Sequence, residues 1–321
     1  MLQQHVERPA PATPARATGS RRLGRRLRTM PPGYRKRVVW ALLLPAILCE
    51  VAVYLAPIAT GTFTSFTRVN QFTIRNWFDA PFVGIANYTA VLGSSVIAGP
   101  VIHSFLVSVG YVACVVTISL FIGFVATVLV RSLRSARFFQ VFFIIPYAIP
   151  VYAGVLAWDF AFQGDGAVKA LLGTDTLWLQ GNHAFIAMVV AAVWRTWPFV
   201  FLMMLAATAN IPSELFEALQ ADGGGRWAET RHIIFPHVRS QLGVLALLLS
   251  IWTFNDFVTP FVFFGQVPPP TADLFPINVY VTTFISFAYS IGAAITLMAV
   301  ILLSVFIVFP YMRMTRLGEE S

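Results

Sequence analysis

The stretch ELFEALQADGGGRWAETRHIIFPHVRS, residues 214–240, forms a loop between two long apolar segments. Pro212 and Ser213, just before it, predict the start of a helix, because serine is a preferred N-cap residue. Glu214 and Glu217 then lie in the first turn, where the helix dipole favours acidic side chains. Two membrane spans are normally joined by a short turn, so a loop of this length is expected to have a role of its own.

Three consecutive glycines, residues 223–225, predict a break after this first helix, since glycine permits a sharp change of direction. A second short helix is predicted over residues 226–235, with Trp227 and Ile234 on one side. Pro236 either ends that helix or begins the next. A helix–glycine–helix projection suits a groove on a partner protein. The alternative is an amphipathic loop that lies on the membrane surface.

Hydrophobic residues make up 57% of the chain and charged residues only 11%. A soluble domain carries about 25% charged residues. A membrane span needs about 20 predominantly apolar residues. Six such spans are predicted, at residues 39–64, 101–130, 141–162, 184–209, 242–264 and 286–311. The sequence therefore predicts an all-α polytopic membrane protein with six transmembrane helices.

The basic residues are distributed unevenly between the two sides of these spans. Of 22 Lys and Arg residues, 18 lie before the first span, between the second and third, in the 214–240 loop or after the sixth. The loops on the other side contain Arg68, Arg75 and Lys169, and Arg195 lies within a span. By the positive-inside rule, both termini and the 214–240 loop are cytoplasmic. Because the basic residues border the membrane, contacts with membrane lipids are expected and nucleic-acid binding is not.

Residues 1–33 are rich in Pro, Arg, Ala and Thr and predict a disordered, basic cytoplasmic tail. Cys49 and Cys114 fall within predicted spans and indicate packing rather than a disulfide or a metal site. The sequence contains no P-loop, zinc motif, catalytic-triad spacing or dinucleotide-binding fingerprint. No enzymatic site, metal site or cofactor of its own is therefore predicted for this chain.

The spacing of acidic, glycine and proline residues in the 214–240 loop resembles that of the cytoplasmic loop of ABC importer permeases. The matching positions are Glu217, Ala218, Asp222, Gly223, Ile233 and Pro236. The sequence departs from the family pattern at Leu219, Gly224, Thr230 and Phe235. The resemblance implies that Glu217, Ala218, Asp222, Gly223 and Pro236 couple the chain to a separate ATPase subunit.

Other segments extend the resemblance over residues 40–311. They are LLLPAILCEVAVYLAPIATGTFTSFT at 42–67, FVGIANY at 82–88, IPYAIP at 145–150, WRTWPF at 194–199 and TFNDF at 253–257. These segments resemble the carbohydrate-uptake permeases, and among them the maltose-type F subunit, the first of two permeases. The resemblance implies a type I ABC importer permease fold over residues 34–317, located in the bacterial plasma (inner) membrane, with IPYAIP opening the third span.

The same resemblance implies several partners and a class of cargo. The partners are a second homologous permease subunit that forms a heterodimer, two ATP-binding subunits that bind ATP-Mg, and an extracytoplasmic solute-binding protein. The expected cargo is a di- or oligosaccharide, and glycerol 3-phosphate or its diesters are the alternative. A standalone channel or secondary transporter would also explain six spans, but neither it nor a membrane enzyme explains the spaced loop.

Arg195 lies about halfway along the fourth predicted span. A charge there costs about 2.5–3.5 kcal/mol on insertion scales, so Arg195 is expected to face the bundle interior or a wet cavity. Asp256 lies in the fifth span, nearer its outer end, and Glu50 lies halfway along the first. These charges either pair internally and hold helices together, or contact cargo.

Alignment with the maltose-type permease through Glu217 and Pro236 implies a set of cargo-facing positions. They are Arg195, Thr196 and Phe199 in the fourth span and Leu249, Trp252, Thr253 and Asp256 in the fifth. Trp252 and Phe199 are expected to stack on apolar sugar faces. Asp256 and Arg195 are expected to bind hydroxyl groups through charge-assisted hydrogen bonds.

Overall fold

The computed structural model describes residues 32–131, 133 and 136–319, with the side chains of residues 38–131, 133 and 138–304. These residues form helices and no named strand; Thr67 and Phe82 make one isolated antiparallel bridge. The α-helices are α2 (Pro32–Glu50), α3 (Ala56–Ser65), α4 (Ala86–Gly93), α5 (Ser95–Arg131), α6 (Ala136–Ala148), α7 (Val151–Phe162), α8 (Ala167–Leu172), α9 (Gly181–Thr208), α10 (Ser213–Ala221), α11 (Arg226–Glu229), α12 (Phe235–Phe254), α13 (Val258–Phe264), α14 (Phe275–Tyr280) and α15 (Tyr289–Glu319). Short π-helical segments lie at Val51–Leu55, Thr230–Ile234 and Val281–Ile285, and 3₁₀ turns at Ile74–Asp79 and Pro270–Ala272.

The chain divides into two compact units, Met1–Gly61 and Thr62–Ser321. The first unit contains α2, the π-helical segment after it and the start of α3. The predicted disordered tail, residues 1–33, lies outside the described residues except for its last two positions, which already belong to α2. The helix over Val38–Ser65 agrees with the first predicted span, 39–64.

Four helical stretches of the described residues are long and apolar enough to span a membrane: Val38–Ser65, Ser95–Arg131, Gly181–Thr208 and Arg226–Phe264. A fifth is possible if Phe138–Ala148 and Val151–Phe162 count as one bent span. The apolar stretch Tyr289–Ser304, in α15, is shorter within the described side chains. Six spans with cytoplasmic termini therefore remain a prediction.

The third predicted span, 141–162, is bent instead of straight. Phe138–Ala148 and Val151–Phe162 meet at an angle of 89°. The bend follows from the sequence, because the residue before a proline is disfavoured in the α-helical region, and Ile149 precedes Pro150. The prediction that IPYAIP opens this span is wrong, since the segment ends α6 and forms the corner between α6 and α7.

The fifth predicted span, 242–264, is also interrupted. Phe254 ends α12, and α13 begins only at Val258, so Asp256 lies in a non-helical break. Local hydrogen bonds replace the helical pattern here: the Asp256 N–H donates to the Thr253 carbonyl over 3.1 Å. Short polar side chains near a helix end commonly compete with the helix in this way.

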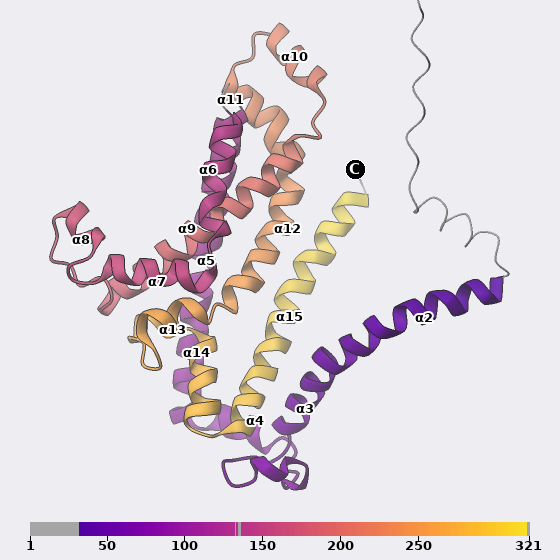
Figure 1. The fold of residues 1–321 in the computed structure, drawn as a ribbon, viewed down its shortest axis with the longest axis vertical. Coiled ribbons are helices and arrows are strands. Elements are labelled where there is room, and N and C mark those ends of the chain that lie inside the picture. The colour runs from indigo at the N-terminus through magenta and orange to yellow at the C-terminus, as the bar shows by residue number, and fades with distance from the viewer. Residues whose placement is uncertain (1–31, 132, 134–135, 320–321) are drawn as a thin grey trace, which may run out of the picture. The chain divides into compact units, whose positions relative to one another are not determined.

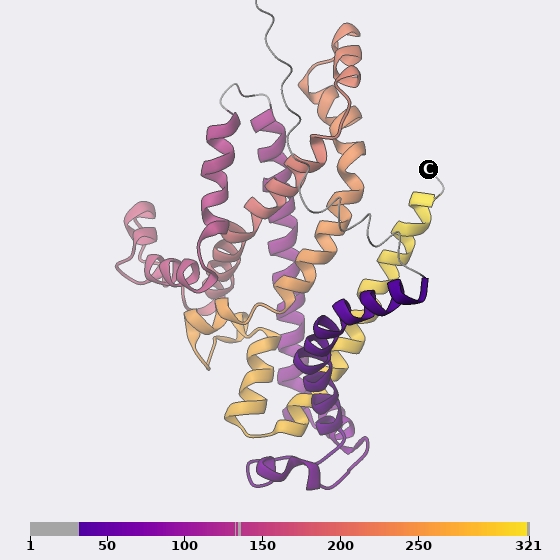
Figure 2. The same cartoon turned by 45° about the vertical axis from the view of Figure 1, so that its right-hand side comes forward.

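The second unit is organised around α5 and α9. The two helices pack along each other, α12 packs against α5, and α6 packs against α9. α5 and α9 lie close together at Gly123, where an added Cβ would lie 2.6 Å from the Cβ of Val200. Tyr111, Met188 and Phe201 are fully buried in this core. In both ribbon views α10 and α11 lie at one end of this unit, and α13 and α14 lie towards the other (Figure 1, Figure 2).

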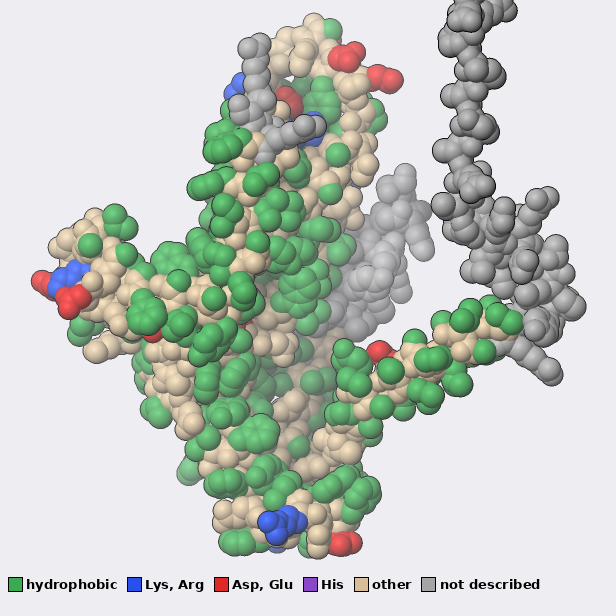
Figure 3. All heavy atoms as spheres, viewed as in Figure 1, with side chains coloured by type: hydrophobic (Ala, Val, Ile, Leu, Met, Phe, Trp, Pro, Cys, Tyr) green, Lys and Arg blue, Asp and Glu red, His purple; other side chains and the backbone are tan. Residues whose placement is uncertain are grey.

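Charged side chains of the second unit gather at its extremities on the face shown in Figure 3. They lie beside α10 and α11, beside α8, and near the segment that follows α3, while hydrophobic side chains cover the surface between these places (Figure 3). A band of exposed apolar side chains between charged ends is what a hydrocarbon environment requires.

Candidate functional site

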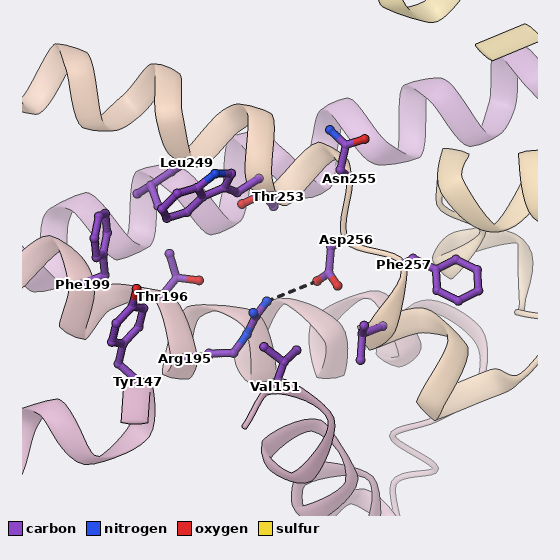
Figure 4. A pocket seen from close by; sticks show the side chains of 12 residues that line it. Tyr147, Val151, Arg195, Thr196, Phe199, Leu249, Thr253, Asn255, Asp256 and Phe257 are labelled. Atoms are coloured by element: carbon purple, nitrogen blue, oxygen red, sulfur yellow. Dashed lines mark ion pairs between the residues drawn. The ribbon is translucent and has the colours of Figure 1, made fainter. Parts of the chain in front are cut away.

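A cavity of about 350 Å³ lies between the middle of α9, the end of α12 and the corner after α6. Its volume falls in the range of about 300–1,000 Å³ that is usual for small-molecule sites. Its lining residues are Tyr147, Val151, Arg195, Thr196, Phe199, Leu249, Trp252, Thr253, Asn255, Asp256, Phe257 and Val258 (Figure 4). All seven cargo-facing positions expected from the sequence line this one cavity.

Three aromatic rings from three helices form one wall of the cavity. Tyr147 of α6 stacks on Phe199 of α9, with ring centroids 5.6 Å apart. Phe199 in turn contacts Trp252 of α12, with centroids 5.3 Å apart. Trp252 is 50% exposed, so this aromatic wall is open on one side. Such a surface is suited to an amphipathic ligand with apolar faces.

The opposite side of the cavity carries one cation and one anion. Arg195 Nη2 lies 3.8 Å from Asp256 Oδ2 (Figure 4). The Asp256 side chain is 5% exposed, and that of Arg195 is 26% exposed. The structure thus brings together the two charges that the sequence left as either an ion pair or cargo contacts. Glu50, the third of these charges, lies in α2 of the other unit and is exposed.

Asp256 is held by side chains that the sequence did not point to. The Tyr111 hydroxyl donates to Asp256 Oδ2 over 2.9 Å, and the Thr259 hydroxyl donates to the same oxygen over 2.6 Å. The Thr259 backbone N–H donates to Oδ1 over 3.1 Å, which satisfies a donor in the first turn of α13. Tyr111 is 145 residues from Asp256 in the chain, so no local sequence pattern predicts this contact. Tyr147 was also missed, although the two prolines beside it signal a bend there.

The 214–240 loop forms a helix, a glycine turn and a second helix, as predicted. Gly223 has φ +74°, a conformation that favours glycine. Its N–H donates to the Gln220 carbonyl, and the Gly224 N–H donates to the Leu219 carbonyl, over 3.0 and 2.8 Å. This pair of bonds is the Schellman arrangement that ends many helices.

The second helix of the loop differs from the prediction. α11 passes through the π-helical segment Thr230–Ile234 directly into α12, so the helix predicted over residues 226–235 does not end there. Of the two roles predicted for Pro236, the start of the next helix is confirmed, because Pro236 lies in the first turn of α12. The π-helical segment before it, in which the Phe235 N–H donates to the Thr230 carbonyl, accommodates the proline within the continuous helix. Trp227 and Ile234, predicted to lie on one side, have different surroundings: Trp227 is 75% exposed and Ile234 is 1% exposed.

Arg131, the last residue of α5, attaches the loop to the helical body. Its Nη1 donates to the Thr208 carbonyl at the end of α9 over 2.8 Å. The same guanidinium lies over the Phe216 ring of α10, 4.9 Å from the centroid. Arg131 therefore touches α9 and the first loop helix at once.

No group of three or more His, Cys, Asp and Glu side chains that could hold a metal ion occurs in the part of the chain that the structure describes. Cys114 is partly buried and packs against the core, as predicted. Cys49 was also predicted to pack in the core, but it is exposed.

Comparison with known proteins identifies the family. Residues 116–317 match the family described as binding-protein-dependent transport system inner membrane component. The permease protein DasB of the diacetylchitobiose uptake system of Streptomyces coelicolor is 27% identical over 292 residues, which cover 88% of each chain. The permease protein SugA of the trehalose transport system of Mycobacterium tuberculosis is 30% identical over 233 residues, covering 72% of this chain and 74% of that protein.

A solved structure shows the same fold. It is the crystal structure of a bacterial ABC transporter involved in the import of the acidic polysaccharide alginate, with a TM-score of 0.72 at 16% identity. The match covers 92% of this chain and 99% of the solved chain. At this identity the likeness establishes the helical architecture alone.

The chain therefore belongs to the family of binding-protein-dependent transport system inner membrane components. It is a multi-pass plasma-membrane protein and a permease subunit of an ABC importer, as its loop spacing predicts. It is a transport component and not an ATPase, and a standalone channel or secondary transporter is excluded.

Proposed function

We propose that this member of the binding-protein-dependent permease family is one of two homologous permease subunits of an ATP-driven importer for a di- or oligosaccharide. Two further subunits would bind and hydrolyse ATP-Mg, and an extracytoplasmic solute-binding protein would deliver the cargo. Related permeases named for diacetylchitobiose and trehalose uptake support the sugar class.

The observation that carries this proposal is the aromatic wall facing a charge-balanced polar side. Sugar rings present apolar C–H faces and a rim of hydroxyls. Trp252 and Phe199 offer ring faces, and Arg195 and Thr196 offer donors, in one cavity. Because Trp252 is half exposed, the second permease subunit would close the open side of the site.

A phosphate-bearing cargo is the alternative, and Arg195 is the feature that favours it. Among the described residues that line the cavity, Arg195 is the single cation, and Asp256 lies 3.8 Å from it. The pair leaves the lining without net positive charge. A neutral sugar needs no net charge, whereas phosphate sites normally concentrate positive donors. The balance of charge supports the sugar.

The mechanism follows from the position of the cavity relative to the loop. The cavity is lined by residues of α6, α7, α9, α12, the break after α12 and the start of α13, and α12 continues without a break from the second helix of the loop. Closure of the ATPase subunits would pull on the 214–240 loop. That pull would shift α12 and α9 and turn the cavity from the outside to the cytoplasm, so that hydrolysis drives alternating access.

The test is uptake by the complete transporter in proteoliposomes. Wild-type protein is assayed with radiolabelled maltose, trehalose, diacetylchitobiose and glycerol 3-phosphate, each with its binding protein. Trp252→Ala should raise KM for the imported sugar about two- to tenfold, because it removes a stacking contact of about 0.5–1.5 kcal/mol. Trp252→Phe should retain most of the affinity. Phe121→Ala is the matched control, because Phe121 is 68% exposed on α5 and does not line the cavity.

Arg195→Ala separates the two kinds of cargo. If Arg195 binds a phosphate, its loss should weaken affinity about ten- to a hundredfold, because a hydrogen bond between charged groups contributes about 1.5–3 kcal/mol. A neutral sugar should lose less. Uptake of glycerol 3-phosphate and of none of the three sugars would overturn the proposal.

A further inference from the structure

The carboxylate of Asp256 is already occupied by the protein. Three donors reach it, namely the Tyr111 hydroxyl, the Thr259 hydroxyl and the Thr259 backbone N–H, at 2.9, 2.6 and 3.1 Å. Its side chain is only 5% exposed. These donors take three of the roughly four lone-pair positions of a carboxylate, and burial leaves little of the rest within reach of a cargo hydroxyl. The geometry thus argues against the direct cargo contact that the sequence led us to expect of Asp256.

Arg195 is in the opposite situation. Its closest approach to Asp256 is 3.8 Å, longer than the roughly 2.7–2.9 Å of a charge-assisted hydrogen bond. Its Nε is buried and has no hydrogen-bond partner among the described residues. The side chain is 26% exposed and lines the cavity. Arg195 is therefore neutralised by a nearby acid without a short hydrogen bond to it, and the exposed part of its side chain lies at the cavity.

We propose that Tyr111 and Thr259 are positioning residues that set cargo affinity by holding the Asp256 carboxylate back from Arg195. In this arrangement Asp256 is a counter-ion and Arg195 is the group that binds a hydroxyl or anionic oxygen of the cargo. The inference rests on the proposed function of the cavity as a cargo site, and it adds two residues that do not touch cargo.

The physical reason is competition for the same oxygen. Both hydroxyls donate to Oδ2, which is also the oxygen nearest to Arg195. When a donor is removed, that oxygen is left with an unmet hydrogen-bonding capacity in a buried place, which is costly. The guanidinium is the nearest replacement donor. The carboxylate then closes on Arg195 and uses the N–H groups that cargo would otherwise use.

The first test is Tyr111→Phe in the complete transporter. The substitution keeps the ring, which packs edge-on against Phe185 with centroids 6.4 Å apart, and removes only the hydroxyl. The expected result is a KM for uptake about two- to tenfold higher, with kcat unchanged and with an increase no larger than that of Arg195→Ala for the same cargo, because the contact between Arg195 and cargo is weakened. The cargo used is whichever of the four radiolabelled compounds above the wild type imports fastest.

The decisive measurement is rescue. In Tyr111→Phe/Asp256→Asn the neutral amide cannot close on Arg195 as an ion pair, so KM should return to within about twofold of the wild type. A hydroxyl with a merely structural role would not be rescued in this way, because removing a second polar partner would add to the damage. Thr259→Val, with and without Asp256→Asn, repeats the test on the other hydroxyl and serves if the Tyr111 variant folds poorly.

A second readout needs no cargo and therefore remains valid if the proposed function fails. The rate of Arg195 modification by phenylglyoxal, followed by mass spectrometry, should fall in Tyr111→Phe and recover in the double variant. Ser119→Ala is the matched control, because Ser119 also lies buried in α5 but its hydroxyl has no partner among the described residues.

Three results would overturn the inference: a wild-type KM in both Tyr111→Phe and Thr259→Val, a double variant no better than the single one, or a KM raised more than about tenfold by Asp256→Asn alone. The last result would make Asp256 a direct ligand of the cargo. Failure of the wild type to import any sugar would instead refute the proposed function, while the phenylglyoxal rates would still decide the role of Tyr111.

Discussion

The 214–240 loop and the cavity differ in how their functional residues are assembled. The expected coupling residues come from one short stretch and are all exposed: Glu217, Ala218, Asp222, Gly223 and Pro236. The cavity instead collects residues from α6, α7, α9, α12, the break after α12 and the start of α13. Of its residues, Leu249, Thr253 and Asp256 are at most 7% exposed. The loop thus offers a free surface to a partner, whereas the cavity is an internal arrangement of distant residues.

The loop and the cavity therefore depend on different features of the chain. The loop depends on a backbone conformation that very few residue types can adopt, so a change there should abolish transport. The cavity depends on side chains that tolerate related replacements, so a change there should alter affinity by a measurable factor. The following experiments test this distinction.

Gly223→Pro should have the largest effect, a complete loss of uptake with normal membrane levels. Gly223 has φ +74°, whereas proline is fixed near −65°. Proline also lacks the N–H that donates to the Gln220 carbonyl. Glu217→Lys, which reverses an exposed charge on α10, should have the same consequence for uptake. Uptake in proteoliposomes and co-purification of the ATPase subunits measure the two steps separately.

Gly225→Ala is the control within the same glycine run. Its φ is −88°, and nothing lies within 4 Å of the position of an added Cβ. This variant should transport like the wild type. If Gly223→Pro retained coupled ATP hydrolysis and uptake, the loop would have no coupling role.

Arg131→Ala should reduce uptake about tenfold while ATP hydrolysis continues. The side chain joins the end of α9 to α10 through the Thr208 carbonyl and the Phe216 ring. A hydrogen bond from a charged group contributes about 1.5–3 kcal/mol, and partial exposure of Arg131 places it at the lower end. The quantity to measure is cargo moved per ATP hydrolysed. An unchanged ratio would show that the loop transmits motion through α12 alone.

The loop was the easier region to predict from the sequence, and its errors lie where long-range packing decides. Three consecutive glycines predict a turn independently of their surroundings. The uninterrupted path from α11 into α12 was missed, because Pro236 was expected either to end one helix or to begin the next, and neither role includes the π-helical segment that joins the two helices. The break at Asp256 was also missed, because an acid within an apolar segment indicates an inward-facing charge and does not by itself predict that the helix is interrupted.

The cavity residues could be placed only through resemblance to a known family. Hydrophobic periodicity locates spans, but it does not say which face of α9 meets which face of α12. Arg195 was the exception, because a charge at the centre of a span must face inwards. Tyr147 and Thr259 carry no such signal, and only the folded arrangement shows that they border the site.

Gly123→Ala tests the scaffold beneath the cavity rather than either functional region. An added Cβ would lie 2.6 Å from the Val200 Cβ and 3.0 Å from the Phe201 backbone nitrogen, so α5 and α9 must separate. Overpacking of this kind costs about 1–3 kcal/mol. Thermal unfolding of the purified complex should show a lower Tm. Gly110→Ala, on the same helix with nothing within 4 Å, is the control, and equal Tm values for the two variants would contradict the packing.

The smallest expected effect concerns Asp273, which lies in the connection between α13 and α14, outside both regions. Burial raises the pKa of this carboxyl above its ordinary value, although the Asn278 side chain and His103 oppose the shift. A carboxyl whose pKa is raised on folding stabilises the protein below the unfolded pKa of about 3.9, and this contribution is lost as pH rises through the folded pKa. The charged form at neutral pH therefore destabilises the folded protein.

Asp273→Asn should remove that destabilisation and raise Tm at pH 7 by about 1 °C, with a smaller difference at pH 5. Uptake should not change, because the residue contacts neither the loop nor the cavity. A lower Tm at pH 7 would mean that the Asn278 hydrogen bond and the charge of His103 outweigh burial. A changed KM would extend the cargo site beyond the cavity.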